Sequence, residues 1–194
     1  MTSLRESWKR TEAHLRRAHE AAGSPVLADF HDCLDQNELE LAADVLADFG
    51  DAREDLAQGF WEALRCAYEN MKLDDRAKRC RLRIYEAEHG FVEARLTLTA
   101  TEDGGRTHPV FTDYRPDWNI GNHTESGEME INGAPITLED AQSIPPGGTG
   151  VVRLHPLWRD AWLKVQPGAE LAMHEGSRVV GNAIVLRVTL RGRA

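Results

Sequence analysis

Residues 104–116 read GGRTHPVFTDYRP. Two glycines open this stretch and two prolines interrupt it, which is typical of a loop between strands. Before it, residues 91–100 (FVEARLTLTA) alternate in the two-residue period of a strand, and residues 182–190 (NAIVLRVTL) form a later strand pattern without a breaker. Further turn patterns occur about every ten to twenty residues, at 132–133 (NG), 145–148 (PPGG), 167–168 (PG) and 175–176 (EG). This spacing predicts an antiparallel β-barrel or sandwich over 91–194.

Two blocks of this region resemble a known family. Residues 104–116 are similar to the GGR-HTP-FF-GYRP pattern that opens the third domain of elongation factor Tu. Residues 174–181 (HEGSRVVG) are similar to the REGGRTVG that closes the same domain, and residues 154–156 (LHP) resemble its LIHP segment. The resemblance covers about residues 91–188. It implies an antiparallel β-barrel that serves as a docking surface and not as a catalyst.

In this family, the barrel contacts the T stem of aminoacyl-tRNA and packs against a GTPase domain. The resemblance therefore implies a set of candidates for contact with RNA or another partner: Arg106, Arg115, Ser126, Gly127, Glu175, Gly176 and Arg178. Arginine pairs with backbone phosphate, and small residues let RNA approach the protein backbone. Charge disfavours tRNA, because Asp117 stands where the family has Gln and residues 91–194 carry ten bases against thirteen acids. RNA-binding modules usually have a basic surplus.

Residues 1–73 carry the 3.6-residue period of amphipathic helices. Ser3 and Glu6 have the spacing of a capping box, and Gly23 is expected to end the first helix. Short breaks between the amphipathic segments predict an antiparallel bundle. Residues 74–90 admit several interpretations: an extension of the helix, a basic linker or an edge element of the sheet. The expected class is α+β, with an acidic helical bundle over 1–73, the linker or edge element over 74–90 and the barrel over 91–194.

The net charge of −9 is concentrated in the helical half. Residues 29–55 contain ten acids and one base, whereas residues 72–83 contain six bases and two acids. A strongly acidic surface repels phosphate and attracts basic proteins. The candidates for such a contact are Asp35, Glu38, Asp44, Asp48 and Asp51. The alternative interpretation is a solvated helix face that binds nothing.

The helical half also resembles a second family. Residues 30–42 (FHDCLDQNELELA) are similar to the FLDHNELGLAL segment of Maf-type immunity proteins, and residues 60–64 (FWEAL) and 68–71 (YENM) fit the second half of such a bundle. These proteins are helical partners of bacterial polymorphic toxins. The resemblance implies that the acidic residues neutralise a basic toxin, which suits their charge.

Patterns of catalytic or metal-binding chemistry are absent from the sequence. It contains no GxxxxGK[ST], HExxH or GxSxG, and its three cysteines form no CxxC. We therefore expect no bound nucleotide, no metal, no cofactor and no catalytic residue. Trp158 and Trp162, four residues apart, predict a helical turn whose indoles cover the end of the barrel, at a point where the chain is longer than the family. This turn is a further candidate for a partner site.

These observations lead to the expectation of a cytoplasmic, bacterial, non-catalytic binding protein. No apolar run is long enough for a transmembrane helix, and the charged first 20 residues do not read as a secretory signal. The leading interpretation is an immunity or antitoxin protein with a basic toxin as its partner. The alternative is a translation-associated module that binds aminoacyl-tRNA or the translation machinery. An enzyme would need a polar pocket that sequence alone does not reveal.

Overall fold

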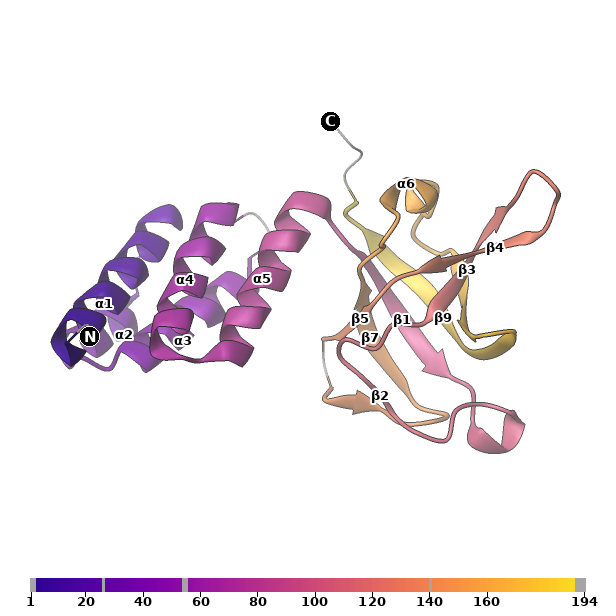
Figure 1. Ribbon diagram of the computed structural model, residues 1–194, viewed down its shortest axis with the longest axis horizontal. Helices are drawn as coiled ribbons and strands as arrows, with labels where there is room; N and C mark the ends of the chain where they lie inside the picture. The colour runs from indigo at the N-terminus through magenta and orange to yellow at the C-terminus, as the bar shows by residue number, and fades with distance from the viewer. Residues whose placement is uncertain (1–2, 26, 54–55, 140, 191–194) are drawn as a thin grey trace. The chain divides into compact units, whose positions relative to one another are not determined.

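The computed structural model describes residues 3–25, 27–53, 56–139 and 141–190. The chain divides into two compact units, Met1–Glu88 and His89–Ala194. The first consists of helices and the second of antiparallel strands with two short helical turns, so the fold is α+β (Figure 1). None of the helices in the described ranges is long and apolar enough to cross a membrane.

The described part of the helical unit contains α1 (Leu4–Ala21), α2 (Ala28–Asp35), α3 (Leu39–Asp51), α4 (Gln58–Met71) and α5 (Asp74–His89). The predicted capping box is confirmed: the Ser3 hydroxyl accepts from the Glu6 N–H at 3.2 Å, and the Glu6 carboxylate accepts from the Ser3 N–H at 2.8 Å. Residues 74–90 form α5 and then lead into the first strand. Of the three interpretations of this stretch, the helix is therefore the one observed. The helix is amphipathic enough to bury Ala77 and Cys80 in the helical core.

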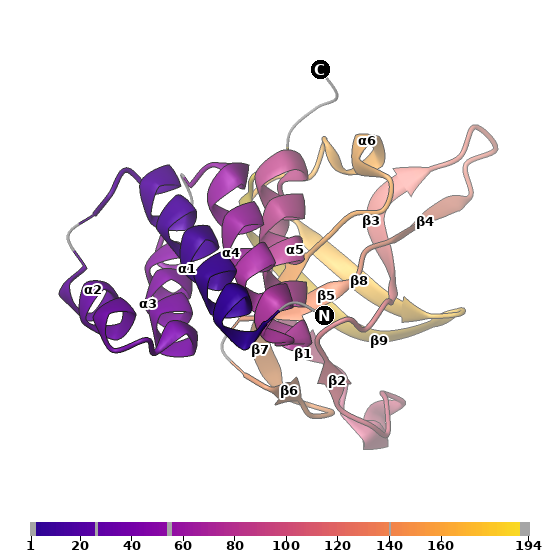
Figure 2. The same cartoon turned by 60° about the vertical axis from the view of Figure 1, so that its left-hand side comes forward.

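The core of the helical unit is built from large side chains on α1 to α4. Leu15, Phe30, Leu46, Phe60 and Leu64 are fully buried. Close packing of α3 on α4 depends on Gly50, because a Cβ there would lie 2.6 Å from ring atoms of both Phe60 and Trp61. Figure 2 shows the helices from the side on which α1 lies in front.

Seven of the described strands form one antiparallel sheet in the order β4-β3-β8-β9-β1-β7-β5. Their bounds are β1 (Val92–Leu98), β3 (Asp117–His123), β4 (Met129–Gly133), β5 (Ile136–Leu138), β7 (Thr149–Leu154), β8 (Glu170–Glu175) and β9 (Arg178–Val188). β2 (Val110–Phe111) and β6 (Ser143–Ile144) pair separately, and two short helical turns, η1 (Thr101–Asp103) and α6 (Arg159–Trp162), complete the unit.

The sheet is a curled half-barrel, whereas the sequence predicted a barrel (Figure 1). β4 and β5 are its two edges and do not pair with each other in the described sheet. The reason lies in the outer edge of β5, which is already used: Ile136 donates its N–H to the Tyr114 carbonyl at 2.9 Å and accepts from Asp113 at 2.8 Å. The loop of residues 112–114 therefore continues the arc in place of a closing strand.

One face of the sheet encloses the core of the unit. Val92, Ala94, Leu96 and Leu98 are buried at alternate positions of β1, which confirms the two-residue period in the sequence. Trp118 from β3 and Trp162 from α6 are fully buried in the same core.

Candidate functional site

Several of the residues implied by the elongation-factor resemblance converge at one end of the sheet. Glu175 ends β8 and Arg178 begins β9, and they pair across a two-residue turn. Gly176 takes the first position of this turn with φ +60°, a conformation that favours glycine in tight hairpins. Arg106 reaches the turn from the loop after η1, and its guanidinium pairs with Oε1 of Glu175. We call Arg106, Tyr114, Glu175 and Arg178 the arginine–glutamate cluster.

The loop that carries Arg106 approaches the sheet closely because residue 105 is glycine. A Cβ on Gly105 would lie 2.0 Å from the Thr99 carbonyl oxygen, so any side chain would push the loop away. The Thr101 hydroxyl donates to the carbonyl of Arg106, the residue after Gly105, at 2.7 Å and so holds the backbone of Arg106 in place. The glycine pair that carries the family resemblance thus positions the arginine.

Arg106 is enclosed by its neighbours. Beyond its ion pair with Glu175, its Nε donates to the His108 carbonyl at 3.2 Å, and its guanidinium lies 4.3 Å from the centre of the Tyr114 ring. The Tyr114 hydroxyl donates to the same Oε1 of Glu175 at 2.5 Å. Only 12% of the Arg106 side chain is exposed. A buried charge with its counter-ion in place acts as a structural tie, which leaves it little capacity for a phosphate.

Two arginines of the predicted set remain open to solvent at this end of the sheet. The Arg178 side chain is 54% exposed and donates to Oε2 of Glu175 at 3.1 Å. Arg115 is exposed and precedes β3 by two residues. Since Asp117 pairs with His174, the chain direction places Arg115 beside the β8–β9 turn. The planar guanidinium of an exposed arginine can form paired hydrogen bonds with two oxygens of a phosphate or carboxylate.

Ser126 and Gly127 do not join this group. They lie in the turn of the β3–β4 hairpin, where the Gly127 N–H donates to the Thr124 carbonyl at 2.9 Å. Asp117 and His123 are the two ends of β3, so this turn is roughly 20 Å from the arginine–glutamate cluster. Glu125 and Glu128 flank the two residues and give the turn an acidic surface.

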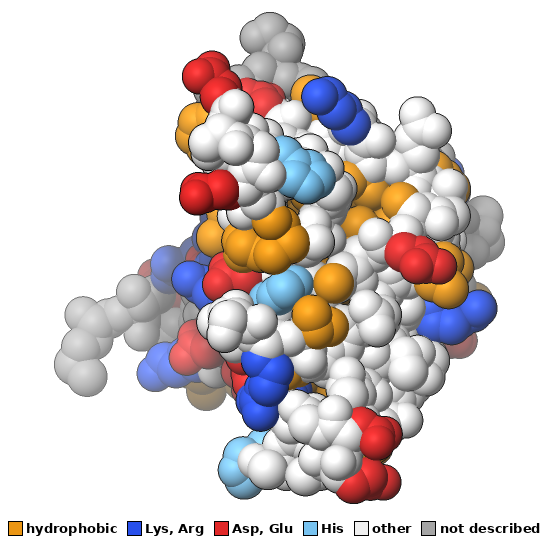
Figure 3. Space-filling view, turned by 90° about the vertical axis from the view of Figure 1, so that its right-hand side faces the viewer, with side chains coloured by type: hydrophobic (Ala, Val, Ile, Leu, Met, Phe, Trp, Pro, Cys, Tyr) orange, Lys and Arg blue, Asp and Glu red, His pale blue; other side chains and the backbone are white. Residues whose placement is uncertain are grey.

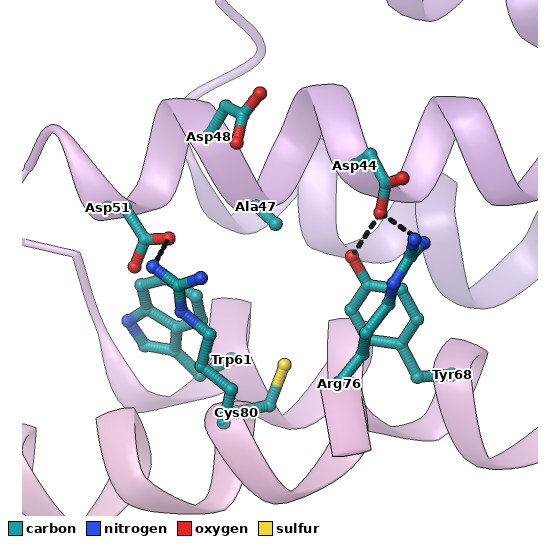
Figure 4. Close-up of a pocket in the computed structure, with 9 residues that line it drawn as sticks. Asp44, Ala47, Asp48, Asp51, Trp61, Tyr68, Arg76 and Cys80 are labelled. Carbon is teal, nitrogen blue, oxygen red and sulfur yellow. Dashed lines mark hydrogen bonds and ion pairs between the residues drawn. The ribbon is translucent and has the colours of Figure 1, made fainter. Parts of the chain in front are cut away.

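The acidic residues predicted as a partner site divide into two groups. Asp44 and Asp51 on α3 face α5 and pair with it (Figure 4). Arg76 donates to Oδ1 of Asp44 at 2.5 Å, and Arg79 and Arg83 reach the two oxygens of Asp51 at 2.6 and 2.9 Å. The acidic and basic stretches of the sequence therefore pair with each other in part, through α3 and α5. Asp44 and Asp51 are thus already paired within the helical unit, and their contact with a partner protein stays a prediction.

Asp35, Glu38 and Asp48 form the second group. All three are exposed, with Asp35 and Glu38 at the turn between α2 and α3 and Asp48 on the same side of α3 as Asp44. Sequence reasoning missed the pairing of α3 with α5, although the opposite charges of residues 29–55 and 72–83 could have indicated it. It also missed Tyr114 as the third partner of Arg106 and Glu175.

A hollow of about 240 Å³ lies between α3, α4 and α5 (Figure 4). It is lined by Asp44, Ala47, Asp48, Asp51, Trp61, Tyr68, Arg76, Arg79 and Cys80. Burial and the neighbouring Asp44 carboxylate raise the pKa of Tyr68, and burial raises the pKa of the Cys80 thiol to about 12. Both groups stay protonated at neutral pH, so neither provides an activated nucleophile. The described residues contain no group of three or more metal-binding side chains that could hold an ion.

Comparisons with known proteins give one kind of similarity. Models of known protein families give no match. Among curated proteins, elongation factor Tu 2 of Streptomyces avermitilis is 34% identical over 95 residues, which is 49% of this chain. The match spans 22% of that protein's length. The chain is thus similar to a short part of an elongation factor, consistent with an elongation-factor-like sheet unit.

Proposed function

We propose that this chain is a non-catalytic binding protein of translation, whose sheet unit is a domain of the third elongation factor Tu type. Its ligand would be the phosphate backbone of a tRNA stem. The observation that carries the proposal is the 34% identity to elongation factor Tu 2 over about half the chain. The convergence of Arg106, Glu175 and Arg178 at one end of the sheet supports it.

Within this proposal the arginines have different roles. Arg106 keeps the loop of residues 104–116 on the β8–β9 turn, because its charge is already paired with Glu175. Arg115 and Arg178 are exposed and would bind phosphate oxygens. With two phosphates neutralised, the logarithm of the affinity should fall by roughly 1.5–2 per tenfold rise in salt. The acidic balance of the unit predicts weak binding, since distant carboxylates repel the same phosphates.

The test is fluorescence anisotropy of labelled tRNA titrated with the full chain at low salt. Arg115→Glu and Arg178→Glu should each weaken binding, and the double variant should abolish the salt dependence. Arg95→Glu is the matched control, because Arg95 is an exposed base of the same unit on β1. The proposal fails if tRNA does not bind at low salt, or if Arg95→Glu weakens binding as much as the other two.

A second candidate is the immunity or antitoxin role suggested by the helical half. The observation that favours it is the exposure of Asp35, Glu38 and Asp48, which could meet a basic protein. Charge reversal at these three positions should then weaken binding to a toxin encoded nearby. Asp44→Asn is the internal comparison, because that carboxylate is bound by Arg76. Unchanged affinity after the triple reversal would remove this candidate.

A further inference from the structure

A row of exposed hydrophobic side chains follows the outer face of β4. Met129 and Ile131 are exposed, whereas Asn132 between Ile131 and Gly133 is buried, so the first two point away from the core. Leu157 continues the row, because its Cδ1 lies 3.2 Å from the position of a Cβ on Gly133. Its side chain is 66% exposed. Large apolar side chains in a row on an edge strand are unusual unless another surface covers them.

Trp158 follows Leu157 in the chain and lies beside α6. It is 65% exposed and lines a hollow of about 510 Å³ together with Gly121, Asn122, His123, Glu130, Asp160, Ala161 and Lys164. We call Met129, Ile131, Leu157 and Trp158 the hairpin–α6 patch. On the side seen in Figure 3, exposed hydrophobic side chains lie among acidic and basic ones.

The patch is held in place by the core beneath it. Trp162 is fully buried, and the Asn122 side chain donates to the Ala161 carbonyl at 3.0 Å, so α6 is fixed to the β3–β4 hairpin. The sequence predicted that both indoles cover the end of the barrel, but only Trp162 does. Trp158 precedes the helix with φ −122° and ψ 85°, so the spacing of four does not place it on the face of Trp162. A large aromatic side chain held outward loses little freedom on binding.

The charges around the patch have one predominant sign. The sequence has no lysine or arginine between Arg115 and Arg153, and the exposed hairpin carries Glu125, Glu128 and Glu130. Asp160 on α6 is a fourth exposed acid, next to the half-buried Arg159, and Lys164 is an exposed base at the hollow. An apolar centre with an acidic rim is complementary to apolar side chains flanked by lysine or arginine. The same rim repels nucleic-acid phosphate.

We propose that the hairpin–α6 patch is a protein-binding surface for a basic amphipathic segment. Apolar side chains of the partner would pack on Leu157 and Trp158, and its basic side chains would meet Glu128, Glu130 and Asp160. Leu157 lies at the end of β4 nearer the arginine–glutamate cluster, because it donates its N–H to the carbonyl of Gly133, and Gly133 pairs with Asp117 beside His174. The proposal differs from tRNA binding in the ligand, because an acidic rim repels phosphate.

The test uses a fluorescein-labelled synthetic peptide of leucine and lysine at helical spacing, with its leucine–glutamate counterpart as the charge control. Anisotropy with the full chain gives the two Kd values. We expect the basic peptide to bind and Trp158→Ala to weaken it by about 30-fold, as for a tryptophan at the centre of an interface. Glu128→Lys with Glu130→Lys should weaken it as well and reduce the salt dependence.

Matched controls separate this surface from general attraction to an acidic protein. Phe111→Ala removes another exposed apolar side chain of the sheet unit, and Glu102→Lys reverses an exposed acid outside the hairpin. Neither should change the Kd. Leu157→Ser is a second variant, and circular dichroism checks that each variant folds.

The proposal is overturned if the basic peptide does not bind, if the acidic peptide binds equally, if duplex RNA competes, or if the patch and control variants behave alike. Trp8 is exposed as well. The proposal is therefore also overturned if Trp158→Ala removes none of the fluorescence that acrylamide quenches in the free chain, because Trp158 is then already covered.

Discussion

The replacement of Arg106 by glutamine tests whether this residue is a structural tie or a ligand-binding group. Arg106 pairs with Glu175 and lies over the ring of Tyr114, with 12% of its side chain exposed. Arg106→Gln keeps a polar side chain but removes the guanidinium and its charge. Arg178→Gln is the matched change, because Arg178 contacts the same carboxylate from a side chain that is 54% exposed.

The expected loss of stability follows from burial. A charged hydrogen bond of a buried side chain contributes about 1.5–3 kcal/mol, and the contact with the tyrosine ring adds roughly 0.5–1 kcal/mol. Glu175 is partly exposed and regains water when Arg106 is replaced. We therefore expect a loss near the lower end of the summed range, about 2 kcal/mol in the free energy of unfolding. The exposed pair of Arg178 with Glu175 should contribute less than about 1 kcal/mol.

Thermal unfolding followed by circular dichroism measures the difference. For a unit of this size, about 2 kcal/mol corresponds to a fall in Tm of roughly 8–16 °C, against a few degrees for Arg178→Gln. Hydrogen exchange of peptides from β8 and β9 assigns the loss to the sheet unit rather than to the helices. Equal, small shifts for the two variants would refute the structural role of Arg106. Arg178→Gln should instead have the larger effect on tRNA affinity.

Three further predictions concern the packing of both units. Asp51→Asn removes the carboxylate that two arginines of α5 share and should cost the helical unit about 2 kcal/mol in urea unfolding, whereas the exposed Asp48→Asn should cost less than about 0.5 kcal/mol. Gly105→Ala should destabilise the sheet unit by about 1–3 kcal/mol, measured by its Tm, because its Cβ would meet the Thr99 carbonyl; an unchanged Tm would contradict this. Burial raises the pKa of Cys80 to about 12, so the folded state favours the protonated thiol. The resulting stability is present below the ordinary thiol pKa and is lost as the pH rises towards 12, and Cys80→Ser should remove this part of a pH–stability profile.

The sequence predicted the local structure well where local rules decide it. The capping box of Ser3 and Glu6 forms as expected, because its partners are three residues apart on one helix turn. The alternation of β1 is also confirmed, since a strand with one buried face must place apolar side chains at every second position. The match to elongation factor Tu 2 agrees with the motif blocks read from the sequence.

Other features depend on contacts between residues far apart in the chain. Asp44 meets Arg76, 32 positions later, and the sequence order does not fix which acid pairs with which base, so a paired carboxylate was interpreted as part of an acidic surface. In the same way, Arg106 meets Glu175 across 69 positions and is enclosed by it. Trp158 and Trp162 have a helical spacing, yet only the core decides which of the two indoles it buries.

The sequence by itself therefore determined the α+β class, the positions of its repeating patterns and the likeness to an elongation factor, because periodicity and motif spacing are local properties. Only the tertiary structure decided which charged side chains are paired within the protein and which remain exposed to a partner. A charge loses its freedom to bind when folding brings a counter-ion to it in a dry environment, and that encounter is set by the packing of distant segments. Arg106 and Asp51 are thus largely buried with their counter-ions and Asp44 is paired with Arg76, whereas Arg115, Arg178 and the apolar hairpin–α6 patch are exposed to partners.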